Sequence, residues 1–463
     1  MATYRSTLLI QRFRKALKIL SEKGPHEFLT RTKEFLQRRG RIDLATNPRK
    51  TLEYDTAPVR FTGKKLDQDS LALALGRLAS QPFSLAISQD DYLQVVGGVQ
   101  LKVADQQKEM NELGQSYLHL SPYQVRSTLD FSNQPGVMMV NLDGQHLGFA
   151  DDETFLAVLS TLIQADALHS IELHHLMGWK LEYIARILKL VGDSAINFWL
   201  HDFFSICPNY PLLRNDREYC HAPDPQSNAC QLCLYGSIRP LHYQAFNDLL
   251  RQFPIHAVAP SEFALELWRD KFPLVTSAGQ VVPNAKLEWG DRLQETRDNQ
   301  PLRIAFVGYP VLHKGWQTWL NLTDKYGKDP RYKFYHFSSD WQPSSNFERV
   351  SVEVTRQNRT AMTEALRENT IDIAFLWSIC PETFSFTLYE SLAAGCTVLT
   401  NQNSGNIQAY VKEHLESGLV LESEDALIAL FEGGSLSEYL VEAQRDGRKS
   451  AKLIVNNTCQ DLF

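Results

Sequence analysis

Two glutamates, Glu382 and Glu390, are separated by seven residues in the C-terminal part of the chain. The apolar run Ile371–Trp377 ahead of them is typical of a buried strand, and good helix formers after Ser385 predict a helix. Glu382 should therefore lie in the loop after a strand, and Glu390 early in the next helix. Backbone N–H groups at the start of that helix can hold a phosphate. Two carboxylates around an anion site suit a nucleotide-sugar, with one binding sugar hydroxyls and the other a ribose diol.

This stretch resembles the Glu-x7-Glu signature of retaining, family-4-type glycosyltransferases (glycosyl transferases group 1), of the kind found in bacterial polysaccharide biosynthesis. Three further matches occur in the family's order along the chain. Ile304–Gly308, followed by Lys314-Gly315, resembles the strand, glycine and Lys-Gly loop of the donor domain. Pro283-Asn284 resembles the Pro-Asn at the domain junction, and Gly97-Gly98 resembles the Gly-Gly loop of the acceptor domain. The alternative is an ordinary strand–helix unit with two chance glutamates.

The resemblance implies the GT-B fold, an α/β architecture with two doubly wound Rossmann-like domains facing across a cleft. The residue pattern agrees with this class, because strand-like runs alternate with helical patterns between residues 83 and 259 and again from residue 303. We divide the chain into a basic amphipathic helical extension (1–50), an acceptor-binding domain (51–258) with a Cys-rich loop (203–240), a nucleotide-sugar-binding domain (259–440) and a C-terminal helix (441–463) that crosses back to the first domain.

The resemblance assigns catalytic roles to Glu382, His201 and Lys314, with no cofactor needed for catalysis. Lys314 would neutralise the leaving diphosphate, and the alternative is a solvated loop lysine. The donor-binding residues implied are Gly308, Lys314, Gly315, Phe384, Ser385, Phe386, Thr387, Glu390, Ser404 and Asn406. For Ser404 and Asn406, a role as helix caps is an equal alternative.

One expected residue is missing from the donor site. The family usually has an arginine shortly after the glycine of the first donor strand, where this chain has Tyr309-Pro310. His313, Arg356 and Arg359 are replacement cations among which the sequence does not choose.

The acceptor side is marked by histidines at strand ends. His201-Asp202 follows one strand-like run, and His174-His175 ends the run before it. Related enzymes place a histidine here near the reacting sugar, although a strand-end histidine is more often structural. Gly97 and Gly98 complete the predicted acceptor-side residues. Asp90-Asp91 could orient acceptor hydroxyls, but surface acids in a loop are the stronger interpretation.

Four cysteines, Cys207, Cys220, Cys230 and Cys233, lie within 27 residues. Such clustering suits a structural zinc site that pins the loop, with His221 as an alternate ligand. In a reducing cytoplasm a metal is favoured over disulfides. An iron–sulfur cluster, disulfides and free thiols remain the alternatives.

Basic charge is concentrated at the N-terminal end. Residues 1–50 hold thirteen Lys or Arg and four Asp or Glu, a net charge of +9. Because the whole chain has a net charge of −7, the remaining residues carry a net charge of −16. Leu9, Phe13, Leu17 and Leu20 share a helical face surrounded by basic residues. This pattern predicts either a helix on an anionic membrane surface or a helical hairpin packed on the acceptor domain. Nucleic acid is not an expected partner, since the region has no recognisable module and the rest is acidic.

The overall composition is that of a soluble globular protein, with 43% hydrophobic and 22% charged residues and a mean hydropathy of −0.29. No apolar run approaches the ~18–20 residues of a transmembrane helix, and no signal-peptide core is visible. We therefore expect a cytoplasmic protein, held peripherally at the inner face of the membrane if the basic helices are a tether.

The function that these observations favour is a retaining glycosyltransferase. It would move a sugar from a nucleoside-diphosphate sugar to a glycan or lipid-linked acceptor in surface polysaccharide assembly. One alternative is a catalytically silent GT-B subunit that binds a glycan or a partner glycosyltransferase, which the missing arginine favours. A sugar-nucleotide epimerase of the same fold is a weaker alternative, because it would not need both the paired glutamates and Lys314-Gly315.

Overall fold

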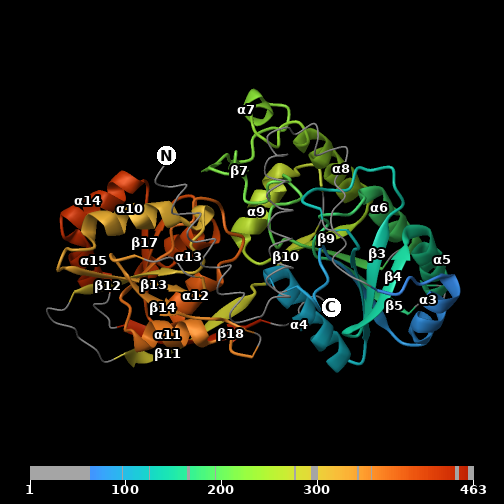
Figure 1. Cartoon of the computed structure of the whole chain (residues 1–463), viewed down its shortest axis with the longest axis horizontal. Coiled ribbons are helices and arrows are strands. Elements are labelled where there is room, and N and C mark those ends of the chain that lie inside the picture. Colours follow the sequence, from blue (N-terminus) through green and yellow to red (C-terminus); the bar gives the residue numbers. More distant parts are fainter. Residues whose placement is uncertain are drawn as a thin grey trace, which may run out of the picture. The chain divides into compact units, whose positions relative to one another are not determined.

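The computed structural model describes residues 63–95, 97–124, 126–163, 167–192, 194–275, 278–293, 301–340, 344–355, 357–443 and 448–456 (Figure 1). The chain divides into two units, residues 1–55 and 56–463, and every described residue belongs to the second. The predicted helical extension at 1–50 and the cation candidate Arg356 lie outside the described residues.

The described residues of the first domain form an eight-stranded sheet in the order β10-β9-β6-β5-β1-β2-β3-β4. Strands β10 through β2 pair in parallel, whereas β3 pairs antiparallel with both β2 and β4 at one edge. The strands are β1 (Phe83–Ile87), β2 (Ser116–Pro122), β3 (Val137–Leu142), β4 (Gln145–Asp151), β5 (Leu168–Leu173), β6 (Ala195–Trp199), β9 (Ile255–Ala259) and β10 (Gly279–Val281). Because β9 and β10 pair here, the first sheet runs past the predicted domain boundary at residue 258.

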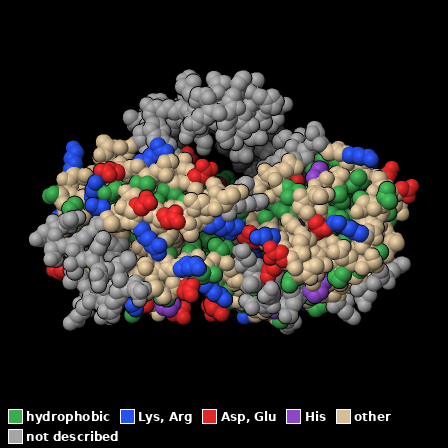
Figure 2. Space-filling view, turned by 90° about the horizontal axis from the view of Figure 1, so that it is seen from below, with side chains coloured by type: hydrophobic (Ala, Val, Ile, Leu, Met, Phe, Trp, Pro, Cys, Tyr) green, Lys and Arg blue, Asp and Glu red, His purple; other side chains and the backbone are tan. Residues whose placement is uncertain are grey.

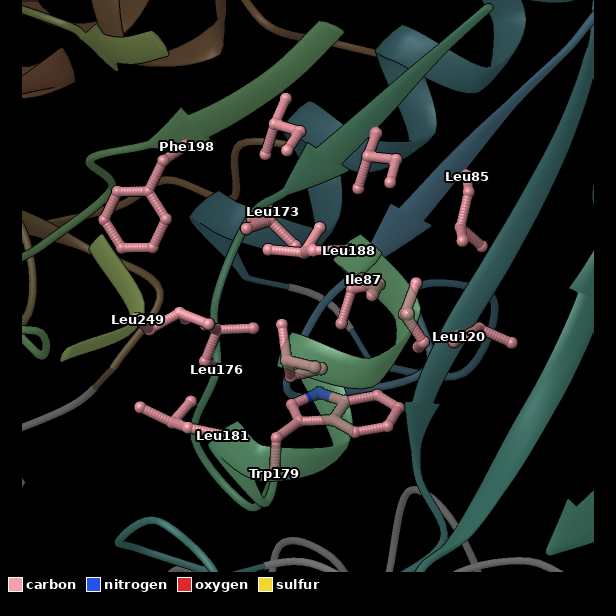
Figure 3. Close-up of a cluster of buried hydrophobic side chains, with 14 of the residues drawn as sticks. Leu85, Ile87, Leu120, Leu173, Leu176, Trp179, Leu181, Leu188, Phe198 and Leu249 are labelled. Atoms are coloured by element: carbon pink, nitrogen blue, oxygen red, sulfur yellow. The ribbon is translucent and has the colours of Figure 1, made fainter. Parts of the chain in front are cut away.

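Helices cover both faces of this sheet, as the alternation of side chains along its strands requires. Leu85 and Ile87 point into the larger core shown in Figure 3, whereas Ala86 between them points into the smaller one. The larger core is closed by α3 (Gln68–Leu75), α5 (Asp152–Leu162), α6 (Leu181–Leu190), α8 (Arg239–Gln252) and α9 (Glu262–Lys271). The smaller core lies under α4 (Gly98–Glu112).

The second domain contains a six-stranded, wholly parallel sheet among its described residues, in the order β14-β13-β12-β15-β16-β17. Its strands are β12 (Leu302–Val307), β13 (Tyr332–Ser338), β14 (Glu348–Ser351), β15 (Ile373–Phe375), β16 (Thr397–Asn401) and β17 (Gly418–Leu421). One face packs on α10 (Trp316–Tyr326), α14 (Glu424–Glu432) and α15 (Ser435–Ala443), and the other on α11 (Ala361–Glu368), α12 (Phe386–Ala393) and α13 (Asn406–Glu413) (Figure 1). The predicted α/β class with two doubly wound, Rossmann-like domains is confirmed.

The predicted C-terminal helix over residues 441–463 was wrong for residues 448–455. Arg448–Val455 forms β18, which pairs antiparallel with β11 (Ala285–Leu293). The physical reason is a two-residue alternation, in which buried Ala451 and partly buried Leu453 flank exposed Lys452. The chain still returns to the first domain after this strand, because Lys102 on α4 donates a hydrogen bond to the carbonyl oxygen of Asn456 over 3.3 Å.

Short elements complete the fold. The segment between β6 and α8 contains the two-stranded ribbon of β7 (Leu213–Arg214) and β8 (Glu218–Tyr219), followed by α7 (Asn228–Gln231). The 3-10 turns are η1 (Gly76–Ala79), η3 (Leu312–Lys314) and η4 (Leu415–Ser417).

Charged side chains of both signs are interspersed on the face of the molecule that Figure 2 shows. Among the described helices, none combines the length and the apolar character needed to cross a bilayer.

Candidate active site

The loop after β12 presents Lys314 at the carboxyl edge of the second sheet. Gly308 ends the strand with a φ of 115°, in the left-handed region that favours glycine. The turn η3 follows, and Gly315, with a φ of 81°, begins α10. A Cβ at Gly315 would lie 2.1 Å from the carbonyl oxygen of Trp377. Glycine at this position therefore lets the lysine loop lie directly against the segment that follows β15.

Glu382 lies in the loop between β15 and α12, and its backbone is held by the segment after β16. The N–H of Asn406 donates to the Glu382 carbonyl oxygen over 2.8 Å, and the Glu382 N–H donates to the Ser404 carbonyl oxygen over 3.4 Å. Gly405 between these partners has a φ of 65°, and a Cβ there would lie 2.5 Å from the Glu382 nitrogen. The position of Glu382 therefore depends on a close backbone approach that only glycine permits.

Lys314 and Glu382 meet as an ion pair, with 2.9 Å between Nζ and Oε1. Burial opposes the charge of Lys314, but attraction to Glu382 and, more weakly, to Glu390 outweighs burial and raises the pKa of the lysine. The lysine is therefore charged at neutral pH and lies within the electrostatic influence of both glutamates. The sequence predicted that these three residues would share a site, and the structure brings them together.

Glu390 lies on α12 and is only 5% exposed. Burial raises the pKa of its carboxyl group to about 7, and Lys314 partly offsets that rise. Ser385 is the N-cap of this helix, since its Oγ accepts the N–H of Leu388 over 3.4 Å. The predicted start of the helix near Ser385 is confirmed.

The other predicted donor residues have different surroundings. Ser404 is fully buried, and its hydroxyl contacts Thr400 and donates to the carbonyl oxygen of Asn401. Asn406 Oδ1 accepts the Ser385 N–H over 3.3 Å. Both side chains therefore hold the loops around Glu382.

Aromatic and hydroxyl side chains flank the start of α12. Phe384 stacks on Tyr389 at 4.6 Å between ring centroids, whereas Phe386 is 37% exposed. The hydroxyls of Thr387 and Ser385 lie 3.0 Å apart. Phe386 is thus an exposed side chain at the start of α12.

The described replacement cations are poorly suited to phosphate. Both contacts of Arg359 Nη2 with the carboxylate of Asp105 on α4 measure 2.9 Å. Burial, followed by the charge of Lys314, lowers the pKa of His313, which is therefore neutral at pH 7. Of the described cation candidates, Lys314 is thus the one that is charged and pairs with a glutamate of this sheet edge.

On the first sheet, the four predicted acceptor-side residues at the ends of β5 and β6 form two contacting pairs. His174 Nδ1 lies 3.0 Å from His201 Nε2, and His175 Nε2 lies 3.0 Å from Asp202 Oδ2. Burial disfavours the charged form of Asp202. The attraction and the hydrogen bond of His175 outweigh this effect and hold the pKa of Asp202 below its ordinary value. Burial lowers the pKa of His201 to about 3, so its imidazole is neutral. His201 therefore serves as a hydrogen-bonding group rather than as a cation.

Thr383 links the glutamate loop to the histidine cluster. Its hydroxyl donates to the carbonyl oxygen of His201 over 2.7 Å, and its own carbonyl accepts from the hydroxyl of Ser261 over 2.7 Å. Ser261 is the N-cap of α9 in the first domain. The structure thus connects the two predicted halves of the site through a residue that sequence reasoning missed, since nothing in the sequence distinguishes Thr383 from its neighbours.

The Gly-Gly loop has a structural role. Gly97 is the N-cap of α4, and Gly98 is the first residue of that helix. The amide of Gln100 on α4 donates to Asp90 over 3.3 Å, and Asn141 donates to Asp91 over 2.9 Å. Asp91 is fully buried, so its interpretation as a surface acid was wrong.

The four clustered cysteines line one small cavity in the segment between β6 and α8, together with Arg239 and Tyr235. Cys207 and Cys230 are buried, and Arg239 donates to Cys230 Sγ over 3.0 Å. None of the four forms a disulfide, and burial raises the pKa of Cys207 to about 12. Among the residues that the structure describes, no group of three or more His, Cys, Asp or Glu side chains is arranged to hold a metal ion.

Comparison with protein-family models and with curated proteins found no match to the chain. Among solved structures, a sucrose-phosphate synthase from Thermosynechococcus elongatus is 13% identical, with 78% of this chain and 90% of that chain covered and a TM-score of 0.46. HepE from Anabaena in complex with UDP-glucose is 11% identical over 78% of this chain and 93% of that chain, with a TM-score of 0.42. A glycosyltransferase from Rickettsia africae is 13% identical over 80% of this chain and 93% of that chain, with a TM-score of 0.48.

Glu390 should make the stability of the protein fall as the pH rises from 4.5 to 7. Its pKa in the folded chain is about 7 against an ordinary 4.5, so within this window the folded chain holds a proton that the unfolded chain has released. The free energy of unfolding should therefore decline by up to about 3 kcal/mol across the window and level off above it. Urea denaturation between pH 5 and 8 measures this decline.

In Glu390→Gln the decline should be smaller. Glu413→Gln, which changes an exposed glutamate on α13, is the matched control and should keep the wild-type slope. An unchanged slope in Glu390→Gln would contradict the raised pKa.

Proposed function

We propose that the protein is a retaining glycosyltransferase of the GT-B type, which uses a nucleoside-diphosphate sugar as donor. The observation that carries this proposal is the Lys314–Glu382 ion pair, at 2.9 Å, with buried Glu390 on the helix that starts beside it. A cation, two carboxylates and a helix N-terminus at the carboxyl edge of a parallel sheet match the parts of a nucleotide-sugar. The resemblance of the Glu382–Glu390 stretch to family-4-type enzymes adds the retaining stereochemistry.

Each group has a role in this chemistry. The acceptor hydroxyl oxygen bonds to the anomeric carbon as the bond between the sugar and the diphosphate breaks, and negative charge develops on the leaving phosphate, which takes up the proton of that hydroxyl. Lys314 and the first N–H groups of α12 stabilise that charge without a catalytic metal. Glu382, adjacent to Lys314, accepts hydrogen bonds from hydroxyls of the transferred sugar, and Glu390 binds the ribose diol. The diphosphate then replaces Glu382 as the partner of Lys314.

On the acceptor side we propose that His201 contacts the reacting sugar. The support is the hydrogen bond from Thr383, one residue after Glu382, to the carbonyl oxygen of His201. A neutral imidazole there accepts or donates a hydrogen bond and orients a hydroxyl. The acceptor proposed is a glycan or a lipid-linked sugar in surface polysaccharide assembly.

A catalytically silent GT-B subunit is the second proposal, because one observation favours it. The position expected to carry an arginine holds Tyr309, and Arg359 is engaged by Asp105, so Lys314 is the cation that the described residues supply. A silent subunit would bind a nucleotide-sugar or a partner enzyme but release no nucleoside diphosphate.

Lys314→Ala and Glu382→Gln should each lower donor hydrolysis by on the order of 10²–10³-fold, because each removes a preorganised contact to the reacting groups. The measurement is nucleoside diphosphate released from a panel of nucleotide-sugars without acceptor. Lys412→Ala, which removes an exposed lysine on α13, is the matched control and should hydrolyse donor at the wild-type rate. Near-wild-type turnover in either site variant would refute the assignment. No release by the wild-type protein with any donor, despite donor binding, would favour the silent subunit.

We also propose that the four cysteines bind a structural zinc ion. The support is that all four thiols line one cavity, and four cysteines are a common ligand set for structural zinc. Arg239, whose guanidinium donates to Cys230, would offset the negative charge of a tetrathiolate site. Binding would require the thiols to release their protons, because zinc binds thiolates.

Purified protein should then contain about one zinc ion per chain, measured by mass spectrometry of the elements. Cys230→Ser should lower the zinc content and increase proteolysis between Cys207 and Cys233, because the binding energy stabilises this segment. Cys396→Ser, which changes a buried cysteine in the other domain, is the control for zinc content. Metal-free protein with four titratable thiols in this segment would overturn the zinc site, and bound iron would replace it with a cluster.

For the basic segment at 1–50 we propose a peripheral attachment to anionic lipid at the cytoplasmic face of a membrane. Its net charge of +9 supports this, since each cation near such a surface contributes about 1 kcal/mol. Removing residues 1–50 should abolish flotation with anionic vesicles and leave donor hydrolysis unchanged. Loss of solubility or hydrolysis in the shortened chain would favour the packed helical hairpin instead.

A further inference from the structure

Glu172, near the carboxyl end of β5, is a fully buried carboxylate with four hydrogen-bond donors. Oε1 accepts from the hydroxyl of Ser170 over 2.7 Å and from the amide of Asn197 over 2.9 Å. Oε2 accepts from the indole N–H of Trp199 over 2.7 Å and from the amide of Gln106 over 3.1 Å. A carboxylate that is hydrogen-bonded on both oxygens is a fixed acceptor, which dictates the orientation of whatever donates to it.

Glu172 therefore determines which way the Gln106 amide points. Gln106 is fully buried on α4, and its NH2 group must face the carboxylate, because the reversed amide would set two acceptors against each other. Its Oε1 then faces His174, at 2.6 Å from Nε2. That oxygen can only accept a hydrogen bond, so the proton of the imidazole lies on Nε2 of His174.

The tautomer of His174 determines that of His201. His174 is 1% exposed, and burial holds its pKa well below the ordinary value, so its ring carries a single proton. With that proton on Nε2, its Nδ1 is an acceptor. His201 Nε2 lies 3.0 Å from this nitrogen and must donate to it. The single proton of neutral His201 is thus on Nε2, and its Nδ1 has a lone pair.

No sequence pattern connects these residues, but their hydrogen bonds form a continuous chain that ends at the proposed site. His201 Nδ1 has no hydrogen-bond partner among the described residues, and the ring is partly exposed. The backbone of His201 contacts the glutamate loop through Thr383. The rings of His174, Trp199 and His201 are stacked, with interplanar angles of 10° to 18°, which restricts rotation of the imidazoles.

We infer that Glu172, Gln106 and His174 are positioning residues that fix His201 in the Nε2–H tautomer, so that Nδ1 accepts a hydrogen bond from a substrate hydroxyl. This inference rests on the proposed function, because it supposes a sugar hydroxyl beside His201. Its physical basis is that the two tautomers of a neutral imidazole offer opposite hydrogen-bonding groups at the same place. We call the hydrogen bonds from Glu172 through Gln106 and His174 to His201 the relay. The relay excludes the Nδ1–H tautomer of His201 before the substrate binds.

Nitrogen-15 NMR of histidine-labelled, full-length protein tests the inference directly. The His201 signals, identified by their loss in His201→Gln, should show a protonated Nε2 and an unprotonated Nδ1 at pH 7. A protonated Nδ1, or an equal mixture of tautomers, would overturn the inference. This readout is independent of turnover, so an inactive protein with the expected tautomer would refute the proposed function alone.

A variant pair tests the role of the relay. Gln106→Met keeps the length of the side chain but removes both amide contacts, so His201 should become a mixture of tautomers. Its donor hydrolysis should lose about 10- to 100-fold in kcat with little change in KM, the effect of one misdirected hydrogen bond. Ser170→Ala removes a different donor to Glu172 and should keep the wild-type tautomer and kcat. Wild-type tautomer and kcat in folded Gln106→Met would overturn the relay, and a kcat lowered equally in Ser170→Ala would assign the loss to general destabilisation.

Discussion

The arrangement of the site depends on the close approach of three loops at the carboxyl edge of the second sheet. The loops follow β12, β15 and β16, and the Lys314–Glu382 ion pair exists only because their backbones touch. Gly315 lies against Trp377, and Gly405 lies against Glu382, each with a positive φ and no room for a Cβ. Because Gly315 and Gly405 have no side chains, the loops can approach closely enough for Lys314 and Glu382 to form their ion pair.

The same sheet edge also explains the electrostatics. Parallel strands direct successive loops to one side, so charges that are far apart in the chain become neighbours. Lys314 and Glu382 are separated by 68 positions, yet their contact partly compensates the burial of both. Glu390, one helical segment away, has no such close partner among the residues that the structure describes, and its raised pKa is the cost of placing a carboxylate where water is scarce.

Much of the second domain's secondary structure could be predicted from the sequence. The central strands of the second sheet are buried on both faces and therefore occur as short apolar runs, of which Ile304–Val307 is typical. The helix start at Ser385 was predictable because N-capping is local. β18 was mistaken for a helix because its two-residue alternation is brief, and its partner β11 lies more than 150 residues earlier in the chain.

Contacts between distant side chains were beyond prediction for a different reason. Arg359 was a candidate for phosphate, but the structure pairs it with Asp105, which is 254 positions away. Glu172 lies in a strand whose sequence pattern predicts burial. The pattern does not identify the hydrogen-bond donors that make burial of a carboxylate tolerable. Periodicity indicates which face of an element is buried, but it carries no information about the side chain opposite.

Thr383 gives the fold a mechanical property. Its side chain and its backbone are each hydrogen-bonded to the first domain. One residue of the glutamate loop therefore links the domains of the two sheets. The two neutral hydrogen bonds of Thr383 contribute only about 1–3 kcal/mol to the association of the domains, a free energy that thermal fluctuations cross readily. The Arg359–Asp105 ion pair and the Lys102–Asn456 hydrogen bond join the same two domains, so these weak contacts act together to hold His201 and Glu382 in one registration.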